Sequence, residues 1–372
     1  MASQSRSALG TAVLVALVAT GCGDGAVPAP FVLECGEGLE AFRGRCVDPA
    51  RRYEPDAPLD ADNVVAFGPV PDLLALPPPP HSGFRIVAPA RTLAAGEEWT
   101  DCVSWPIPDI ARDVVYAARL YTTPGLHHSN VIAKPPDPSL GPNPYPACHP
   151  GSADAFSQFP VLPDVLFANS TQVVGDETIV FPAGLGYVLD TTREISSSIH
   201  LLNSAAEPLP LEVVYDFFTM APSDLAAEVA PFVMQVDDFS IPAHQTAVVE
   251  ATCKVFGGTL LTLMPHTHQW ARSFVADLIP FQGPAERVAD EAGFDLESDI
   301  ELLSPPRDLS EIDAMHFACD IDNTTDHEMH YGIGENEMCI LFGYLYPAEK
   351  QFAAHAPFQG EVCQSFQLGN LE

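Results

Sequence analysis

The chain has 372 residues, of which 47% are hydrophobic, and a formal net charge of −34 at pH 7. This length suggests two domains or one large one, and so negative a chain would repel nucleic acid, which excludes that class of partner. Short runs rich in Val, Ile, Phe and Leu are interrupted by Pro, Gly, Asn and Asp, and no long stretch carries the helical period of apolar residues. This pattern predicts an all-β protein built from sandwiches.

The first 22 residues have the layout of an export signal. An apolar run over residues 8–20 is too short to span a membrane permanently. The small residues 19–21 precede Cys22 as in a bacterial lipobox, although Ala19 stands where Leu or Val is usual. We therefore expect cleavage before Cys22 and lipidation of this cysteine, which would anchor the protein to a membrane of the bacterial cell envelope. The alternative is a plain secreted protein.

Residues 23–83 are predicted to form a proline-rich tether, with the stiff segment Leu-Pro-Pro-Pro-Pro at 76–80. Cys35 and Cys46 could close a small loop within it. Besides Cys22 the chain has eight cysteines, and an even number in an exported chain predicts four disulfides. None lies in a Cys-x-x-Cys arrangement, so zinc-ribbon and thioredoxin-type sites are not expected.

Two adjacent histidines, His127 and His128, lie in a β-like run that follows the turn signal at 122–125. Neighbouring side chains on a regular strand face opposite ways, so the backbone must bend if both are to bind one ion. Pro124 and Gly125 make such a bend plausible. A third ligand could be His200, in another β-like run, and three imidazoles with an open position suit copper or zinc.

A second pair, His266 and His268, follows the apolar run 260–263. On an extended strand two residues of this spacing face the same side, where they could bind one metal ion. Two core or surface histidines that happen to be neighbours are the alternative. Met338 is a candidate for the missing ligand, because a thioether favours Cu(I). The alternative for Met338 is a core methionine.

In this order and at these spacings, the His-His pair, the single His, the His-x-His pair and the Glu-Met-Cys segment resemble the copper type II, ascorbate-dependent monooxygenases. This family includes peptidylglycine α-hydroxylating and dopamine β-monooxygenases, and the resemblance covers about residues 84–368. It implies two tandem jelly-roll-type β-sandwich domains, at 84–220 and 221–372, that face each other across a solvent-filled cleft.

The resemblance also implies a set of site residues and a reaction. The implied copper ligands are His127, His128 and His200 for an electron-supplying ion, and His266, His268 and Met338 for an oxygen-binding ion. The last three would be the catalytic residues. Two copper ions, reduced by ascorbate or another one-electron reductant, would then use O₂ to hydroxylate a C–H bond of a small molecule.

The resemblance further implies the disulfides Cys102–Cys148, Cys253–Cys363 and Cys319–Cys339, which leaves Cys35 with Cys46. His330, near the methionine segment, is expected to make structural hydrogen bonds. The remaining histidines are expected on surfaces or loops; they are His81, His149, His244, His316, His327 and His355.

Three positions depart from the peptide-amidating members of the family. Met264, Ile340 and Phe342 stand where those members use Arg, Asn and Tyr to hold a substrate carboxylate. Apolar side chains cannot compensate for the desolvation of a carboxylate, so we expect a less polar substrate. Two other hypotheses stay open. One is a non-enzymatic copper-binding envelope lipoprotein, and the other is a zinc hydrolase built on the first three histidines, which leaves Met338 without a role.

Overall fold

The structure is a computed structural model that describes residues 40–42, 45–47, 65–67, 72–74, 76, 82–107, 114–134, 164–169, 175–190, 193–293, 301–332, 335–356 and 363–368. The described residues form strands joined by turns and by two short 3₁₀ helices, η2 (Pro222–Asp224) and η3 (Ala348–Lys350), which confirms the all-β prediction. Several predictions concern residues that the structure does not describe. They are the export signal, the lipidation of Cys22, the surface positions of His81 and His149, and the disulfides Cys35–Cys46 and Cys102–Cys148.

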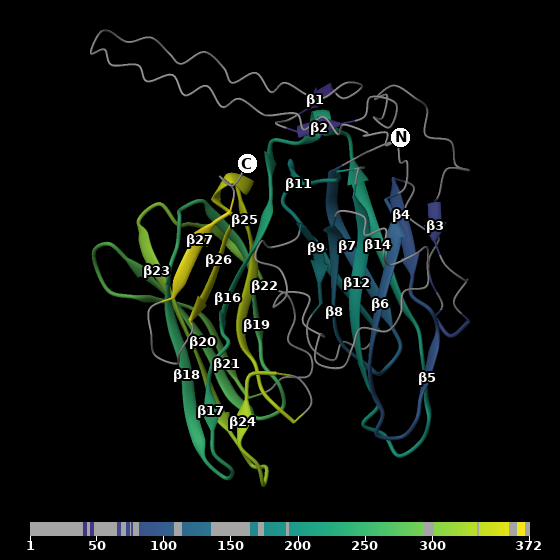
Figure 1. Ribbon diagram of the computed structural model, residues 1–372. Helices are drawn as coiled ribbons and strands as arrows, with labels where there is room; N and C mark the ends of the chain where they lie inside the picture. The colour runs from purple at the N-terminus through teal and green to yellow at the C-terminus, as the bar shows by residue number, and fades with distance from the viewer. Residues whose placement is uncertain are drawn as a thin grey trace, which may run out of the picture.

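The first half of the chain forms two sheets that pack face to face (Figure 1). One sheet has the order β15-β11-β7-β14-β4-β3, with β10 also paired to β7, and the other has the order β6-β12-β8-β9. The strands are β3 (Val65–Phe67), β4 (Gly83–Val87), β6 (Glu98–Pro106), β7 (Val114–Thr122), β8 (Leu126–Lys134), β9 (Asp164–Ala168), β10 (Gly175–Val180), β11 (Leu185–Val188), β12 (Glu194–Leu202), β14 (Val213–Met220) and β15 (Ala227–Glu228). Phe84 and Phe217 from the larger sheet share one buried core with Val131 and Ile199 from the smaller sheet.

The second half repeats this arrangement with sheet orders β22-β19-β25-β16-β26-β27 and β18-β23-β20-β21. The strands are β16 (Ala230–Val236), β18 (Thr246–Lys254), β19 (Thr259–His266), β20 (Ala271–Pro280), β21 (Glu286–Ala292), β22 (Glu301–Asp308), β23 (Ile312–Asp322), β25 (Cys339–Tyr346), β26 (Phe352–Ala356) and β27 (Gln364–Gln367). Its core joins Phe232 and Leu341 of one sheet to Phe274 and Phe317 of the other. The chain passes from the first pair of sheets to the second at Val229, a few residues after the boundary expected near residue 220.

Three two-stranded ribbons complete the described structure: β1 (Glu40–Phe42) with β2 (Arg45–Val47), β5 (Arg91–Leu93) with β13 (Leu209–Leu211), and β17 (Ser240–Ile241) with β24 (Met329–His330). Parts of the predicted tether belong to the fold. Strand β3 pairs with β4, and the backbone N–H groups of Asp72, Leu73 and Leu74 donate to the carboxylate of Glu212.

Two disulfides, Cys253–Cys363 and Cys319–Cys339, join the facing sheets of the second half. They are two of the pairs that the resemblance implied. Disulfides are typical of exported proteins, so they suggest an oxidising, extracellular compartment. Within the described residues there is no helix with the length and apolar character that a membrane span needs.

The two halves meet along the outer face of strands β19 and β25. Side chains alternate along β25, so that Leu341 points into the second core while Ile340 and Tyr344 point towards the first half. The ring of Tyr344 lies 5.2 Å from that of Phe181, measured between centroids, and Ile340 shares a buried cluster with Val165 of β9. This apolar contact fixes where the ends of β19 and β25 lie relative to β8 and β12.

Candidate metal centre

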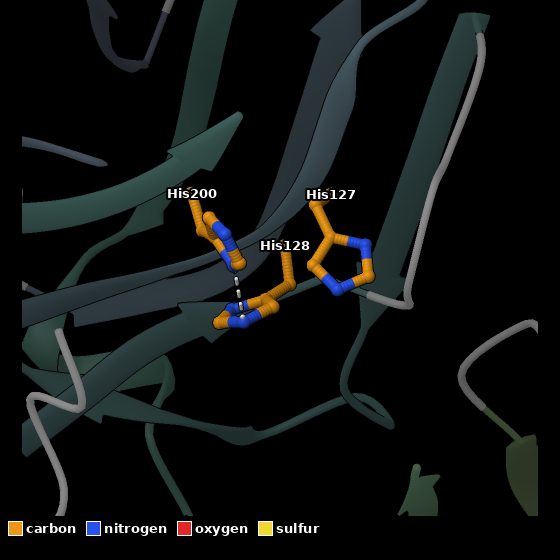
Figure 2. Close-up of side chains that lie close together, drawn as sticks. All are labelled: His127, His128 and His200. Atoms are coloured by element: carbon orange, nitrogen blue, oxygen red, sulfur yellow. Dashed lines mark hydrogen bonds between the residues drawn. The ribbon is translucent and has the colours of Figure 1, made fainter. Parts of the chain in front are cut away.

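The first three predicted ligands lie together at one end of two paired strands, His127 and His128 on β8 and His200 on β12 (Figure 2). In the register of the pair, His200 is opposite His128 but Leu201 is opposite Leu126, so His127 is the extra residue of a β-bulge. A bulge re-aims a side chain that would otherwise face away. The bend that two adjacent ligands require is therefore in the strand itself, not in the turn before it.

The geometry of these three side chains fits a single metal ion. Their ligand atoms all lie within 4.8 Å of one another, and Nδ1 of His200 is 3.2 Å from Nε2 of His128. Two nitrogens that each lie about 2.0 Å from one tetrahedral ion are about 3.3 Å apart. The short contact between these two rings, drawn in Figure 2, is therefore the separation expected of two ligands of one ion.

The contacts of the two nitrogens of each ring show which nitrogen is available to bind a metal. Nε2 of His200 contacts Oε1 of Glu98 at 2.6 Å, which leaves Nδ1 for a metal. The same hydrogen bond from His200 lowers the pKa of Glu98. A carboxylate in this place orients a metal-binding histidine and raises its basicity. Nδ1 of His127 is buried and has no hydrogen-bond partner among the described residues, as suits a metal ligand.

The second pair, His266 and His268, does not lie on one extended strand as the sequence predicted. Strand β19 ends at His266, which pairs with Ile340 of β25, so His268 lies beyond the strand and is not positioned by its alternation. The segment before β25 holds His268 instead: its backbone N–H donates to Glu337, and its Nδ1 contacts the carbonyl oxygen of Asn336 at 3.0 Å. Nε2 of His268 is buried, without a hydrogen-bond partner in the described part of the chain.

Glu337 connects the second histidine pair to Met338. Its side chain is fully buried, and it accepts the backbone N–H groups of His268, of Trp270 at 3.2 Å and of Met338 at 2.8 Å. Burial raises the pKa of Glu337 to about 8. One oxygen, Oε1, accepts from both His268 and Met338, so the two backbones lie side by side. The side chain of Met338 is buried in the apolar cluster that also contains Met264.

The two sets of ligands form one cluster. Ring centroids are 5.4 Å apart for His127 and His268, and 5.1 Å apart for His128 and His266, although each pair joins different halves of the chain. The resemblance implied a solvent-filled cleft between the two sets. Here the rings of the two sets are in contact, with His128 half-buried and the other four buried, because the apolar faces of β19 and β25 pack directly on the first half.

Burial also sets the protonation state of the cluster. Removal from water lowers the pKa of His127 and His128 well below the ordinary value, with smaller contributions from neighbouring histidines. The same cause lowers the pKa of His266 to about 3 and that of His268 to about 4. These four imidazoles are therefore neutral at neutral pH, which is the form that binds a metal.

A buried hydrogen-bond network supports the bulge from behind. Oδ1 of Asn169 accepts both the backbone N–H and the hydroxyl of Ser129, each at 2.6 Å, and the hydroxyl of Tyr215 donates to Ser129 at 2.6 Å. Sequence reasoning did not assign these residues, nor Glu98 and Glu337. Glu337 stood in the Glu-Met-Cys segment that carried the resemblance, whereas nothing in the sequence around Glu98 distinguishes it from a surface glutamate.

The other described histidines lie outside the cluster. His244, His316, His327 and His355 lie near surface carboxylates. His330 has an exposed side chain, and its backbone bonds to Asn336 and Glu337 support the segment that leads to Met338.

Comparison with known proteins adds no family. No protein-family model matches the chain, and no curated protein matches it. Among solved structures it is similar to the PBSX exported protein XepA, with 8% identity and a TM-score of 0.20, over 72% of this chain and 88% of that one. A structure of infectious bursal disease virus, Gt strain, matches with 13% identity and a TM-score of 0.13, over 78% of each chain. Scores this low carry no argument about fold or function.

Proposed function

We propose that the protein is a copper-dependent monooxygenase that hydroxylates a C–H bond of a small, apolar molecule with O₂ and an external reductant such as ascorbate. One observation carries the proposal: five histidines from the two halves, four of them buried and His128 half-buried, come together in one cluster beside the segment that holds Met338. Orphaned nitrogens on His127 and His268 fit a metal ion, because an unpartnered buried nitrogen is otherwise costly.

The residues of the chain have separate roles in this proposal. His127, His128 and His200 would hold one copper, and His266, His268 and Met338 the other. When bound, copper supplies the one-electron redox chemistry and the activation of O₂. Glu98 binds Nε2 of His200 and so orients Nδ1 of this ring towards the metal. The carbonyl oxygen of Asn336 binds Nδ1 of His268 and so orients Nε2 towards the metal. No protein acid or base is needed for this reaction.

Copper is favoured over zinc by Met338. Zinc is bound by thiolate, imidazole and carboxylate, whereas a thioether suits Cu(I). The segment carrying Met338 is also fixed on both sides, by the bonds of Glu337 and by the disulfide Cys319–Cys339. Such fixing is expected of a ligand, and a zinc hydrolase on the first three histidines would not need it.

The surroundings of the second set support an apolar substrate. The ring of Phe342 lies 6.2 Å from that of His266, and Met264 is opposite Phe342 in the register of β19 and β25. Neither side chain can bind a carboxylate. A small, uncharged aromatic or alkyl compound is therefore the proposed substrate class. We also propose that the protein acts in the cell envelope, held there by the lipid on Cys22.

A non-enzymatic copper-binding protein is the second candidate. The observation in its favour is the contact between the two sets of histidines, since rings whose centroids are 5.4 and 5.1 Å apart leave no space for a substrate between them. A storage or scavenging protein would bind copper tightly without turnover. Two dissimilar ligand sets, one with a thioether, favour redox chemistry and therefore the monooxygenase over a storage protein.

The test is oxygen uptake by the copper-loaded protein with ascorbate and a panel of uncharged aromatic and alkyl compounds under ¹⁸O₂. The proposal predicts uptake that depends on the added compound, with the label in a hydroxylated product. His268→Ala should abolish it, and His244→Ala, a surface histidine outside the cluster, should not. Tight copper binding without any labelled product across the panel would favour the non-enzymatic candidate.

A further inference from the structure

His128 occupies a special place among the five histidines. Its ligand atom lies within 4.8 Å of those of His127 and His200, and a second group with the same limit consists of His128, His266 and His268. Its ring centroid is 4.9 Å from that of His200 and 5.1 Å from that of His266. His128 is thus the one histidine that belongs to both possible three-histidine sites.

The second group contains ligands from both halves of the chain. His128 comes from β8, His266 from the end of β19, and His268 from the turn after it. Three imidazoles within this distance make a complete ligand set for copper or zinc. Without His128, the second half offers two imidazoles, and any further ligand must come from the segment that carries Met338.

We infer that His128, His266 and His268 form a metal site across the two halves, so that the five histidines are one connected centre and not two separate ones. The identity of the metal rests on the proposed function. An ion bound by ligands from both halves ties the halves together, because its binding free energy is available only while they are in contact. Two ions in this centre would share a ligand neighbourhood and lie close to each other.

The first test uses the double variant His127→Ala/His200→Ala, which removes the two ligands that belong to the first set alone. Loaded with one equivalent of Cu(II), it should show three coordinated imidazoles by pulsed EPR. Adding His128→Ala should reduce this number to two. The affinity for Cu(II) should fall by at least about tenfold, since loss of even an outer-sphere partner costs that much. Adding His244→Ala to the double variant instead, at an exposed position outside the cluster, is the matched control and should change neither value.

The outcomes separate this inference from the proposed function. Two coordinated imidazoles with or without His128 would overturn the cross-half site and leave the copper site of His266, His268 and Met338 intact. If the double variant takes up no copper, both the cross-half site and the copper site of His266, His268 and Met338 are wrong.

A second measurement needs no variant and covers the case in which one fails to fold. In the oxidised protein with two copper ions per chain, the connected centre predicts interacting spins. The integrated EPR intensity should then fall below two spins per chain, with broadened lines. Two full, non-interacting type II signals would overturn the inference while confirming that the protein binds copper.

Discussion

The most informative single residue is Met338, because only its sulfur distinguishes a copper monooxygenase from other histidine sites. Met338→Leu keeps the apolar volume in the buried cluster, so the fold should tolerate it. We expect it to take up Cu(II) nearly as well as the parent but to lose most turnover, since the thioether matters for Cu(I). X-ray absorption of the reduced protein should show a Cu–S contribution in the parent and none in the variant.

Met264→Leu is the matched control, because Met264 lies in the same cluster and also carries a sulfur. It should keep the Cu–S contribution. If the parent shows no sulfur ligand, Met338 is a core residue and the monooxygenase proposal loses its most specific support.

Glu98 tests the orientation of the first set. Glu98→Gln removes the charge that faces Nε2 of His200 and lets the amide present a donor instead of an acceptor. Outer-sphere partners of this kind are worth about 10- to 100-fold in metal affinity, so the affinity of the first site should fall within that range. A competitive chelator titration measures it. Glu97→Gln, at the neighbouring position, should leave the affinity unchanged, and an equal loss in both variants would contradict the assigned role.

At the scale of strands, the network behind the bulge should matter for stability and for metal binding together. Asn169→Ala leaves the N–H and the hydroxyl of Ser129 without their acceptor, and burying unsatisfied groups costs about 1–3 kcal/mol. Urea unfolding should show this loss, and the first site should bind copper more weakly. Tyr215→Phe removes the hydroxyl that donates to Ser129 but leaves Asn169 as the acceptor of both Ser129 donors, so it should have the smaller effect.

The disulfides give a second prediction at this scale. Non-reducing peptide mapping should find Cys35–Cys46 and Cys102–Cys148 in addition to the two pairs of the second half. In the chain-entropy model, loss of a native disulfide costs about 3 kcal/mol for a short loop such as Cys35–Cys46 and about 4 kcal/mol for a longer loop such as Cys102–Cys148. A peptide that joins Cys102 to a cysteine of the second half would contradict the division of the chain into two halves.

Much of the fold could be predicted from the sequence, but the position of the ligands could not. Alternating apolar runs indicated strands, and the spacing of the histidines and Met338 selected the candidate residues. The bulge at His127 depends on the register between β8 and β12, and His268 depends on Glu337 and Asn336, almost 70 residues away in the chain. The contact between the two sets depends on how the halves pack, which sequence spacing does not report.

For the whole molecule, the metal-free protein should lose stability in mild acid. Folding lowers the pKa of His266 to about 3 and of His268 to about 4, so between those values and the ordinary 6.5 the unfolded chain binds more protons. These histidines therefore make the free energy of unfolding rise with pH across this window and fall as the pH drops below 6.5. Glu337 acts in the opposite direction, because its raised pKa makes the folded chain bind one proton more than the unfolded chain above the ordinary value of 4.5. It is one group against four histidines with a lowered pKa, so the net dependence keeps the sign of the histidines. Each such histidine contributes up to about 1.4 kcal/mol per pH unit.

Urea unfolding of the metal-free protein at pH 7 and pH 5 measures this dependence. His266→Gln should make the difference between the two pH values smaller by the contribution of one histidine, because the amide does not titrate. His244→Gln, at an exposed position, should leave it unchanged. A free energy of unfolding that is equal at the two pH values would show that the histidines are not buried in the metal-free protein.

The most direct test of the central claim, that ligands from both halves bind copper, is the copper content of the protein after equilibrium dialysis. Elemental analysis should find two copper ions per chain in the parent. A variant with alanine at His127, His200, His266 and His268 should retain less than one. A parent that retains no copper, or a fourfold variant that retains as much as the parent, would contradict the account.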